Sequence, residues 1–211
     1  VLQVGLSHAE LFTAGGRVAL AADLLWKKAV LVERSRFHPP TNLTMDLLDC
    51  AQKAMLADTG IEAGSLTVLS EMTLRNLSDS DTGEIDVQDF LSRADILCAL
   101  GKNVLISNYG EYYQLAQYLF NYTNMPIAIT MGLLSLRQIF NEKYYVDLPG
   151  GILESFGRLF KNDLRLYVCP EKNMGTDGLV NVHSMQVKPH LSHLYAYLLE
   201  NNIVNPLDTV N

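Results

Sequence analysis

"GKNVLISNYGEYYQLAQYL", residues 101–119, holds a strand, a turn and the start of a helix in one continuous stretch. The apolar run 104–106 favours a buried strand, and the polar residues "SNYG" at 107–110 interrupt it. After Gly110 the apolar residues recur with the period of a helix. Because a plain turn needs none of this polar chemistry, the stretch predicts either a ligand loop or a well-made turn between a strand and a helix.

The same alternation of strand and helix runs along the whole chain. Strand patterns cover 9–13, 29–33, 65–72, 103–107, 126–131 and 164–168, and helical patterns cover 20–28, 45–56, 86–100, 111–122, 133–145, 150–162 and 189–202. Short strands that are apolar on both faces and alternate with helices are typical of parallel sheets. We therefore predict an α/β fold, Rossmann-like and three-layered, with a mainly parallel sheet of about five or six strands and helices on both faces. The pattern leaves open whether the sheet is doubly wound or an incomplete barrel.

Composition limits the classes of function. The chain has 211 residues, of which 48% are hydrophobic and 18% charged, and no linker divides it, so we predict one α/β domain over 1–211. Its net charge of −7 disfavours nucleic acid as a partner, and the absence of an apolar run of about 18 residues disfavours a membrane span. Cys50, Cys98 and Cys169 lie far apart, which favours reduced thiols and a cytoplasmic protein. The chain begins without Met, so we expect a fragment or a processed form.

Four of the predicted strands end in the stretches 33–35, 71–73, 107–110 and 131–132, and the first three of these stretches are rich in polar residues. Parallel strands bring their carboxyl ends to one edge of the sheet, where ligands bind, so we expect these residues to converge in a polar pocket. Glu33 and Glu71 are the candidate catalytic groups, as an acid–base pair or as metal-holding carboxylates. The alternative for both is a salt bridge to Arg34, Arg75 or Lys102. The predicted ligand-binding residues are Arg34, as partner of an anion, and Thr73, Ser107, Asn108, Tyr109, Gly110 and Gly132.

Two stretches are candidates for binding an anion through the backbone. Ser107 or Asn108 is predicted to cap a helix that starts near Gly110, and the free N–H groups there would suit a phosphate or carboxylate. In the alternative, these side chains only cap the helix. Gly150 and Gly151 stand at the start of another predicted helix and could form a nest of N–H groups, or simply a loop that needs positive φ.

Several known motifs are absent or incomplete. The chain lacks the GxGxxG pattern of dinucleotide sites, and "ILCALGKN" lacks the first Gly and the final Ser or Thr of a phosphate loop. Residues 78–89 resemble a calcium loop, but the ligand positions and the expected strand–helix frame do not fit. His190 and His193 have no matching Cys or carboxylate, so we predict no metal site at these histidines. No cofactor can be assigned from these patterns.

The segments "VLVERSRF", "EMTLRNL", "LGKNVLISNYGEYYQLAQYL", "LPGGILESFGRLFKNDLRLYV" and "PHLSHLYAYLLEN" together resemble a family of large bacterial proteins. The chain is similar to the C-terminal half of these proteins, which often carry the label nicotinate or nicotinamide mononucleotide adenylyltransferase, or TonB-dependent receptor. The resemblance implies that the chain is the C-terminal part of a larger protein, with nucleotidyl transfer in NAD metabolism as the activity of that label. An (H/T)xGH motif would be needed for this reaction, whereas "GLSHAEL" offers only His8. "LLSLRQIF" likewise offers Arg137 without the expected Ser-Ser-Thr.

These observations lead to two functional hypotheses. In the first, the edge formed by the strand ends binds a small phosphorylated or carboxylated metabolite such as a nucleotide, and an enzyme of this kind would catalyse group transfer. In the second, the chain is a non-catalytic docking or dimerisation module for the N-terminal region of the larger protein or for a second copy. A pocket above the strand ends favours the first hypothesis, and a large apolar patch on the outer helices favours the second.

Overall fold

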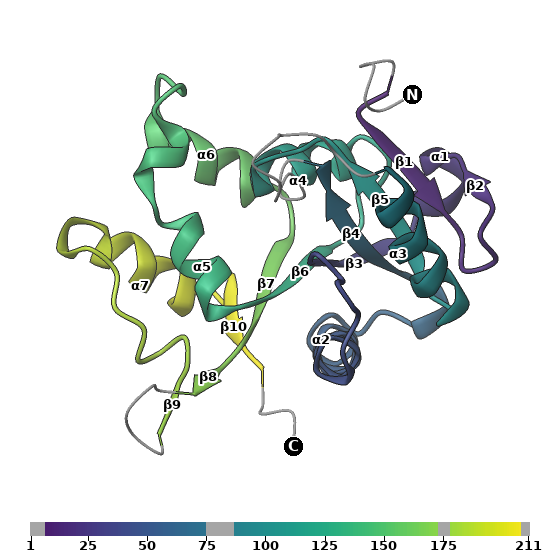
Figure 1. The fold of residues 1–211 in the computed structure, drawn as a ribbon. Coiled ribbons are helices and arrows are strands. Elements are labelled where there is room, and N and C mark those ends of the chain that lie inside the picture. Colours follow the sequence, from purple (N-terminus) through teal and green to yellow (C-terminus); the bar gives the residue numbers. More distant parts are fainter. Residues whose placement is uncertain (1–6, 75–86, 173–177, 208–211) are drawn as a thin grey trace.

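A computed structural model describes residues 7–74, 87–172 and 178–207, with the gaps at the grey segments of Figure 1. Within these residues the chain forms an α/β fold around a mostly parallel sheet, as the alternating pattern predicts. None of the helices in this part of the chain combines the length and apolar character needed to cross a bilayer. The polar turn predicted at 78–86, with most of the calcium-like loop, lies outside the described residues.

The central sheet of the described residues has eight strands in the order β10-β7-β6-β3-β4-β5-β1-β2. Their bounds are β1 Ala9–Phe12, β2 Val18–Ala19, β3 Ala29–Arg34, β4 Leu66–Thr73, β5 Asn103–Ser107, β6 Ile127–Gly132, β7 Leu164–Cys169 and β10 Val204–Pro206. The six strands from β10 to β5 are parallel, whereas β1 and β2 add an antiparallel edge. A separate pair, β8 Glu171–Lys172 and β9 Leu179–Val180, lies outside this sheet.

The order of the parallel strands settles the question that the sequence left open. Counted along the chain, they lie in the order 3-2-1-4-5-6, which is that of a doubly wound, Rossmann-type sheet. The order reverses between β3 and β6, which are neighbours in the sheet although α2, β4, α3, β5 and α4 separate them in sequence. In such sheets a crevice forms at the carboxyl ends of the strands at this point.

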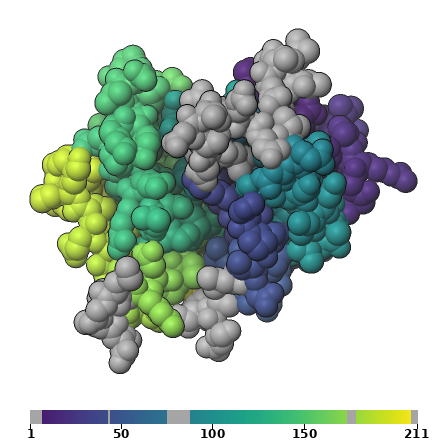
Figure 2. All heavy atoms as spheres, in the orientation of Figure 1, coloured from purple at the N-terminus to yellow at the C-terminus, as the bar shows by residue number. Residues whose placement is uncertain are grey.

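Seven helices surround the sheet in the described residues (Figure 1). Their bounds are α1 Ala21–Leu25, α2 Asn42–Thr59, α3 Val87–Ala99, α4 Tyr112–Phe120, α5 Leu133–Ile139, α6 Gly151–Leu159 and α7 Ser192–Glu200. Side chains of α1 and of α4 to α7 pack on one face of the sheet in a single hydrophobic core, and we call this face the first face. Helices α2 and α3 cover the opposite face through two smaller cores. In the space-filling view α2 lies between α3 and the later, green half of the chain (Figure 2).

Alternation along the strands decides which side chains reach which core. Val30 and Val32 of β3 belong to the core under α4 and α5, while Ala29 and Leu31 belong to the core under α2. Because successive side chains of a strand point to opposite faces, the polar residues at the strand ends divide in the same way. This division sets the layout of the site.

Candidate functional site

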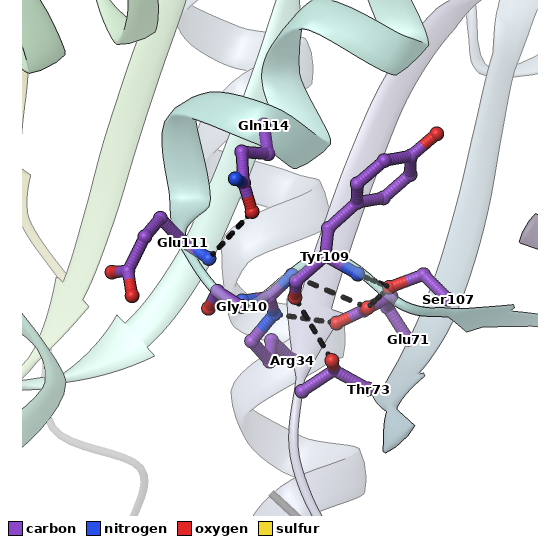
Figure 3. A network of polar contacts seen from close by, with 8 residues as sticks. All are labelled: Arg34, Glu71, Thr73, Ser107, Tyr109, Gly110, Glu111 and Gln114. Carbon is purple, nitrogen blue, oxygen red and sulfur yellow. Dashed lines mark hydrogen bonds and ion pairs between the residues drawn. The ribbon is translucent and has the colours of Figure 1, made fainter. Parts of the chain in front are cut away.

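The ends of three neighbouring strands meet in one buried polar network on the first face of the sheet (Figure 3). Arg34 at the end of β3 donates from Nε to Glu71 Oε2 over 2.6 Å and from Nη2 to Glu71 Oε1 over 3.3 Å. Ser107 of β5 donates to the same Oε1 over 2.5 Å. The side chains of Arg34 and Glu71 are only 5% and 0% exposed, so the pair is shielded from water. The salt bridge that the sequence predicted as an alternative for Glu71 is therefore present, and its partner is Arg34.

The network also fixes the loop 108–111 that follows β5. Arg34 Nη1 donates to the Gly110 carbonyl over 2.8 Å, and Thr73 Oγ1 donates to the Tyr109 carbonyl over 2.8 Å. The Tyr109 N–H donates to Ser107 Oγ over 3.2 Å. These bonds use two side chains of the sheet to hold two carbonyl groups of the loop, so the polar residues at the strand ends act together as supports for its backbone.

The capping role predicted for Ser107 and Asn108 is wrong. Helix α4 begins at Tyr112 and its N-cap is Glu111, whose backbone N–H donates to Gln114 Oε1 over 3.2 Å. Ser107 is the last residue of β5, too far along the chain from α4 to cap it, and its buried hydroxyl donates to Glu71. The N–H of Asn108 donates to the His8 carbonyl over 2.9 Å. Three N–H groups of the predicted anion loop, at 108, 109 and 111, thus donate within the protein.

The nest predicted at Gly150 and Gly151 is also occupied by the protein itself. The N–H of Gly150 donates to Glu154 Oε2 over 2.8 Å, and Glu154 in turn pairs with Arg158 over 2.5 Å. Gly151 has φ of +55°, which confirms the alternative of a loop that needs a positive angle. A carboxylate from the same helix already holds the position that an external anion would take.

A cavity of about 370 Å³ opens beside the Arg34–Glu71 pair, at the carboxyl edge where the strand order reverses. It is lined by Arg34, Ser35, Arg36, Thr73, Gly110, Glu111, Tyr112, Ser135, Gln138, Ile139, Tyr144 and Tyr145. Its volume falls in the lower part of the range of small-molecule sites, and its lining mixes aromatic rings with hydroxyl, amide and charged groups. The predicted pocket above the strand ends is therefore present.

Tyrosines form the aromatic part of this lining. The Tyr112 ring lies 4.8 Å from Arg34 Cζ, measured to the ring centroid. Burial raises the pKa of Tyr112, and it also raises the pKa of Tyr145, although Arg34 and a hydrogen bond from Ser135 act in the opposite direction on Tyr112. Both phenols therefore remain protonated near neutral pH, and the Tyr145 hydroxyl donates to the Ile139 carbonyl over 2.7 Å. For Arg34 burial lowers the pKa, but the charge and hydrogen bond of Glu71, together with Tyr112 and Glu111, outweigh burial and the pKa of Arg34 is raised.

Glu33 lies on the other face of the sheet and does not form a pair with Glu71. In the sheet register Glu33 stands beside Ser70 of β4 and Thr130 of β6, whereas Arg34 stands beside Glu71. Glu33 is 4% exposed, and Ser70 and Thr130 are fully buried. Within the described residues, Glu33 Oε2, Ser70 Oγ and Thr130 Oγ1 have no hydrogen-bond partner in the protein. Burial raises the pKa of Glu33 to about 8, against the opposing charge of Lys102.

These three unpaired oxygens form a row on adjacent strands, which in a sheet lie about 5 Å apart, and their chemistry suits a buried water. Unpaired polar atoms in a protein interior cost free energy unless water or an ion satisfies them. The acid–base pair of Glu33 and Glu71 predicted from the sequence is therefore wrong, because alternation places the two carboxylates on opposite sides of the sheet.

The predicted ligand-binding residues are divided among three places. Arg34, Thr73 and Gly110 line the main cavity, whereas Ser107 is buried in the network beneath it. Asn108 and the Tyr109 ring line a second cavity on the outer side of the loop. In Figure 3 the Tyr109 ring points away from Arg34 and Thr73, although its carbonyl joins their network. Gly132 is the N-cap of α5 and lines neither of these cavities.

Sequence reasoning missed the half of the main cavity that follows β6. Ser135 and Gln138 belong to α5, and Tyr144 and Tyr145 belong to the short 3-10 turn Glu142–Tyr145 behind it. The sequence contained one usable signal, since Ser135 and Gln138 are polar, three residues apart and therefore on one side of a helix that starts directly after a strand. Their partners across the cavity could not be named without the strand order.

Comparison with known proteins does not assign the chain to a family. No model of a protein family matches the chain. No curated protein matches it either. The cavity at the reversal of strand order, its polar and tyrosine lining and the buried pair beneath it are therefore the basis on which a function can be proposed.

Proposed function

We propose that the chain binds a small phosphorylated or carboxylated metabolite, of the nucleotide class, in the cavity beside Arg34. The observation that carries this proposal is the position of the cavity, at the carboxyl edge between β3 and β6 where the order of a Rossmann-type sheet reverses. This is the place where doubly wound sheets bind their ligands. A cavity here favours ligand binding over the docking module as the function of the chain.

The lining supplies groups suited to such a ligand. Arg34 uses three of the five N–H groups of a guanidinium for Glu71 and Gly110, which leaves an oriented, partly committed cation at the cavity wall. Tyr112 and Tyr144 offer ring faces for a base or another planar group, while Ser135 and Gln138 offer hydrogen bonds. The ligand is thus held by a ring-stacking wall and a polar wall that face one cavity.

Binding is the function that this geometry supports best, ahead of catalysis. The Glu71 carboxylate is committed to Arg34 and Ser107, and Glu33 faces the other side of the sheet. Neither carboxylate therefore stands over the cavity as a general base. Nucleotidyl transfer, which the resemblance to the bacterial family implies, remains a prediction that needs groups beyond these two.

A thermal-shift screen against AMP, ATP, nicotinate mononucleotide and sugar phosphates tests the proposal. At a concentration of about 100 times Kd, a true ligand should raise Tm by about 5–10 °C, because it binds only the folded state. A screen in which no compound of this class shifts Tm, followed by calorimetry that detects no binding, would contradict the proposal.

Replacing one tyrosine of the cavity should separate specific binding from general effects. Tyr144→Ala removes a half-exposed ring from the cavity wall, and we expect Kd to rise about tenfold through loss of stacking. Tyr197→Ala is the matched control, since Tyr197 is similarly exposed but belongs to α7 and lies outside the cavity lining. Isothermal titration of both variants checks the result, and equal Kd values for the two would place the ligand elsewhere.

A further inference from the structure

A second cavity, of about 380 Å³, lies on the outer side of the loop that closes the first. Its lining is made of four carboxamide side chains, Asn108, Gln114, Gln117 and Asn121, and three ring side chains, His8, Tyr109 and Tyr118. No Asp, Glu, Lys or Arg is among these described lining residues, in contrast to the first cavity. The two cavities therefore present different chemistry on either side of one loop.

The carboxamides of this cavity are available to a ligand. Within the described residues, the side-chain amides of Asn108, Gln117 and Asn121 form no hydrogen bond to the protein. Gln114 accepts the Glu111 N–H at Oε1 over 3.2 Å, which fixes the direction of its amide and leaves the NH₂ group. A carboxamide both donates and accepts hydrogen bonds, so four of them in one cavity offer paired donors and acceptors without charge.

The rings form a continuous series along the cavity wall. His8 stacks on Tyr109 with ring centroids 6.3 Å apart, and Tyr109 contacts Tyr118 at 5.4 Å. Tyr118 meets Tyr122 edge to face at 5.1 Å, which anchors the series on α4. Burial raises the pKa of Tyr109 and of Tyr118, so both hydroxyls stay neutral. The wall thus combines ring faces with neutral hydroxyl groups.

We propose that this cavity binds a neutral saccharide. Each sugar hydroxyl donates and accepts hydrogen bonds, which matches the paired donors and acceptors of the carboxamides. The apolar C–H face of a sugar ring matches a tyrosine face. A phosphorylated or carboxylated ligand finds no Lys or Arg in the described lining to compensate for the loss of its hydration. The proposal rests on a different cavity and different residues from the proposed metabolite site, and each can hold without the other.

Saturation-transfer NMR and calorimetry with the 211-residue chain test this site. The probes are glucose, galactose, mannose, N-acetylglucosamine and their disaccharides. We expect saturable binding of at least one probe and a Kd about tenfold higher for Gln117→Ala, because a buried sugar hydroxyl loses its partner. Tyr118→Phe keeps the ring and should weaken binding less than Tyr118→Ala. Gln52→Ala, on the opposite face of the sheet, is the matched control and should leave the Kd unchanged.

Two outcomes would overturn the proposal. One is the absence of saturable binding by every probe, with circular dichroism showing a folded chain. The other is binding that Gln117→Ala and Gln52→Ala affect equally, which would place the sugar outside the cavity. Failure of the metabolite site has a different signature, since binding of the phosphorylated compounds depends on Tyr144 and not on Gln117.

Discussion

Replacing Arg34 by methionine should lower the free energy of unfolding by about 3–5 kcal/mol, the usual cost of leaving one charge of a buried pair without its partner. Glu71 is fully buried, and its remaining bond from Ser107 cannot neutralise a carboxylate. The variant also leaves the Gly110 carbonyl without its donor. Urea denaturation at pH 7 measures this change directly.

Two further variants make the test of the Arg34 pair specific. Arg165→Met breaks the partly exposed pair with Asp163, which has the same kind of contact at 3.0 Å, and should cost only about 0–1 kcal/mol. The double variant Arg34→Met with Glu71→Leu removes both buried charges and should recover most of the lost stability. A cost for Arg34→Met as small as that for Arg165→Met would show that the pair does not stabilise the fold.

The double variant also separates stability from function. It should fold, yet its loop at 108–111 would lack the Arg34 donor that holds the Gly110 carbonyl on the cavity wall. We therefore expect weaker binding of the proposed metabolite by a protein of nearly normal stability. Unchanged affinity in this variant would show that the pair supports the fold without positioning the site.

Glu33 should make the stability of the protein fall as pH rises from about 4.5 to about 8. Burial raises the pKa of Glu33 to about 8 in the folded state, while the unfolded chain ionises near the ordinary value of 4.5. Between these values the folded state holds a proton that the unfolded state has lost, so rising pH favours unfolding. Above about pH 8 both states are ionised and this contribution no longer changes.

Glu33→Gln should remove this dependence, since the amide has nearly the shape of the protonated carboxyl but cannot ionise. At pH 8–9 the variant should be more stable than the wild type by about 3–5 kcal/mol, from about 1.4 kcal/mol for each pKa unit. Lys102, whose charge lowers the pKa of Glu33, pairs with Asp49, and Tyr167, which stands beside Thr130 in the sheet, donates to Asp58. Glu62→Gln, at an exposed position, is the control.

Urea denaturation from pH 5 to pH 9 measures the effect of Glu33. The free energy of unfolding should fall with pH at the same slope in the wild type and in Glu62→Gln. In Glu33→Gln the fall between pH 5 and pH 8 that Glu33 causes should be absent. Parallel curves for the wild type and Glu33→Gln would contradict a neutral, buried Glu33. A structure at high resolution should also show an ordered water among Glu33, Ser70 and Thr130, because their buried oxygens have no partner in the protein.

Much of the fold follows from local patterns in the sequence. The six predicted strands correspond to β1, β3, β4, β5, β6 and β7 within one or two residues at each end. These strands were recognisable because buried parallel strands are continuous apolar runs between helical repeats. The pattern missed β10, which has only three residues, and β2, which has two, because so short a run carries no periodicity.

The candidate site was predictable only in part. The sequence indicated that polar residues at the strand ends would meet, and Arg34, Glu71, Thr73 and Ser107 do meet on one face. It did not separate Glu33 from Glu71, although alternation along a strand contains this information once the register is known. In the sheet Arg34 stands beside Glu71, so Glu33 must stand beside Ser70 and point to the other face.

The sequence by itself determined the α/β class, the longer strands and helices and the edge of the sheet that carries polar groups, because these depend on neighbours within a few residues. The strand order and the register were decided only by the tertiary structure, because they depend on pairing between segments far apart in the chain. That pairing joins β3 to β6, brings Ser135 and Tyr144 to the cavity beside Arg34, and turns the loop 108–111 into a wall shared by two cavities.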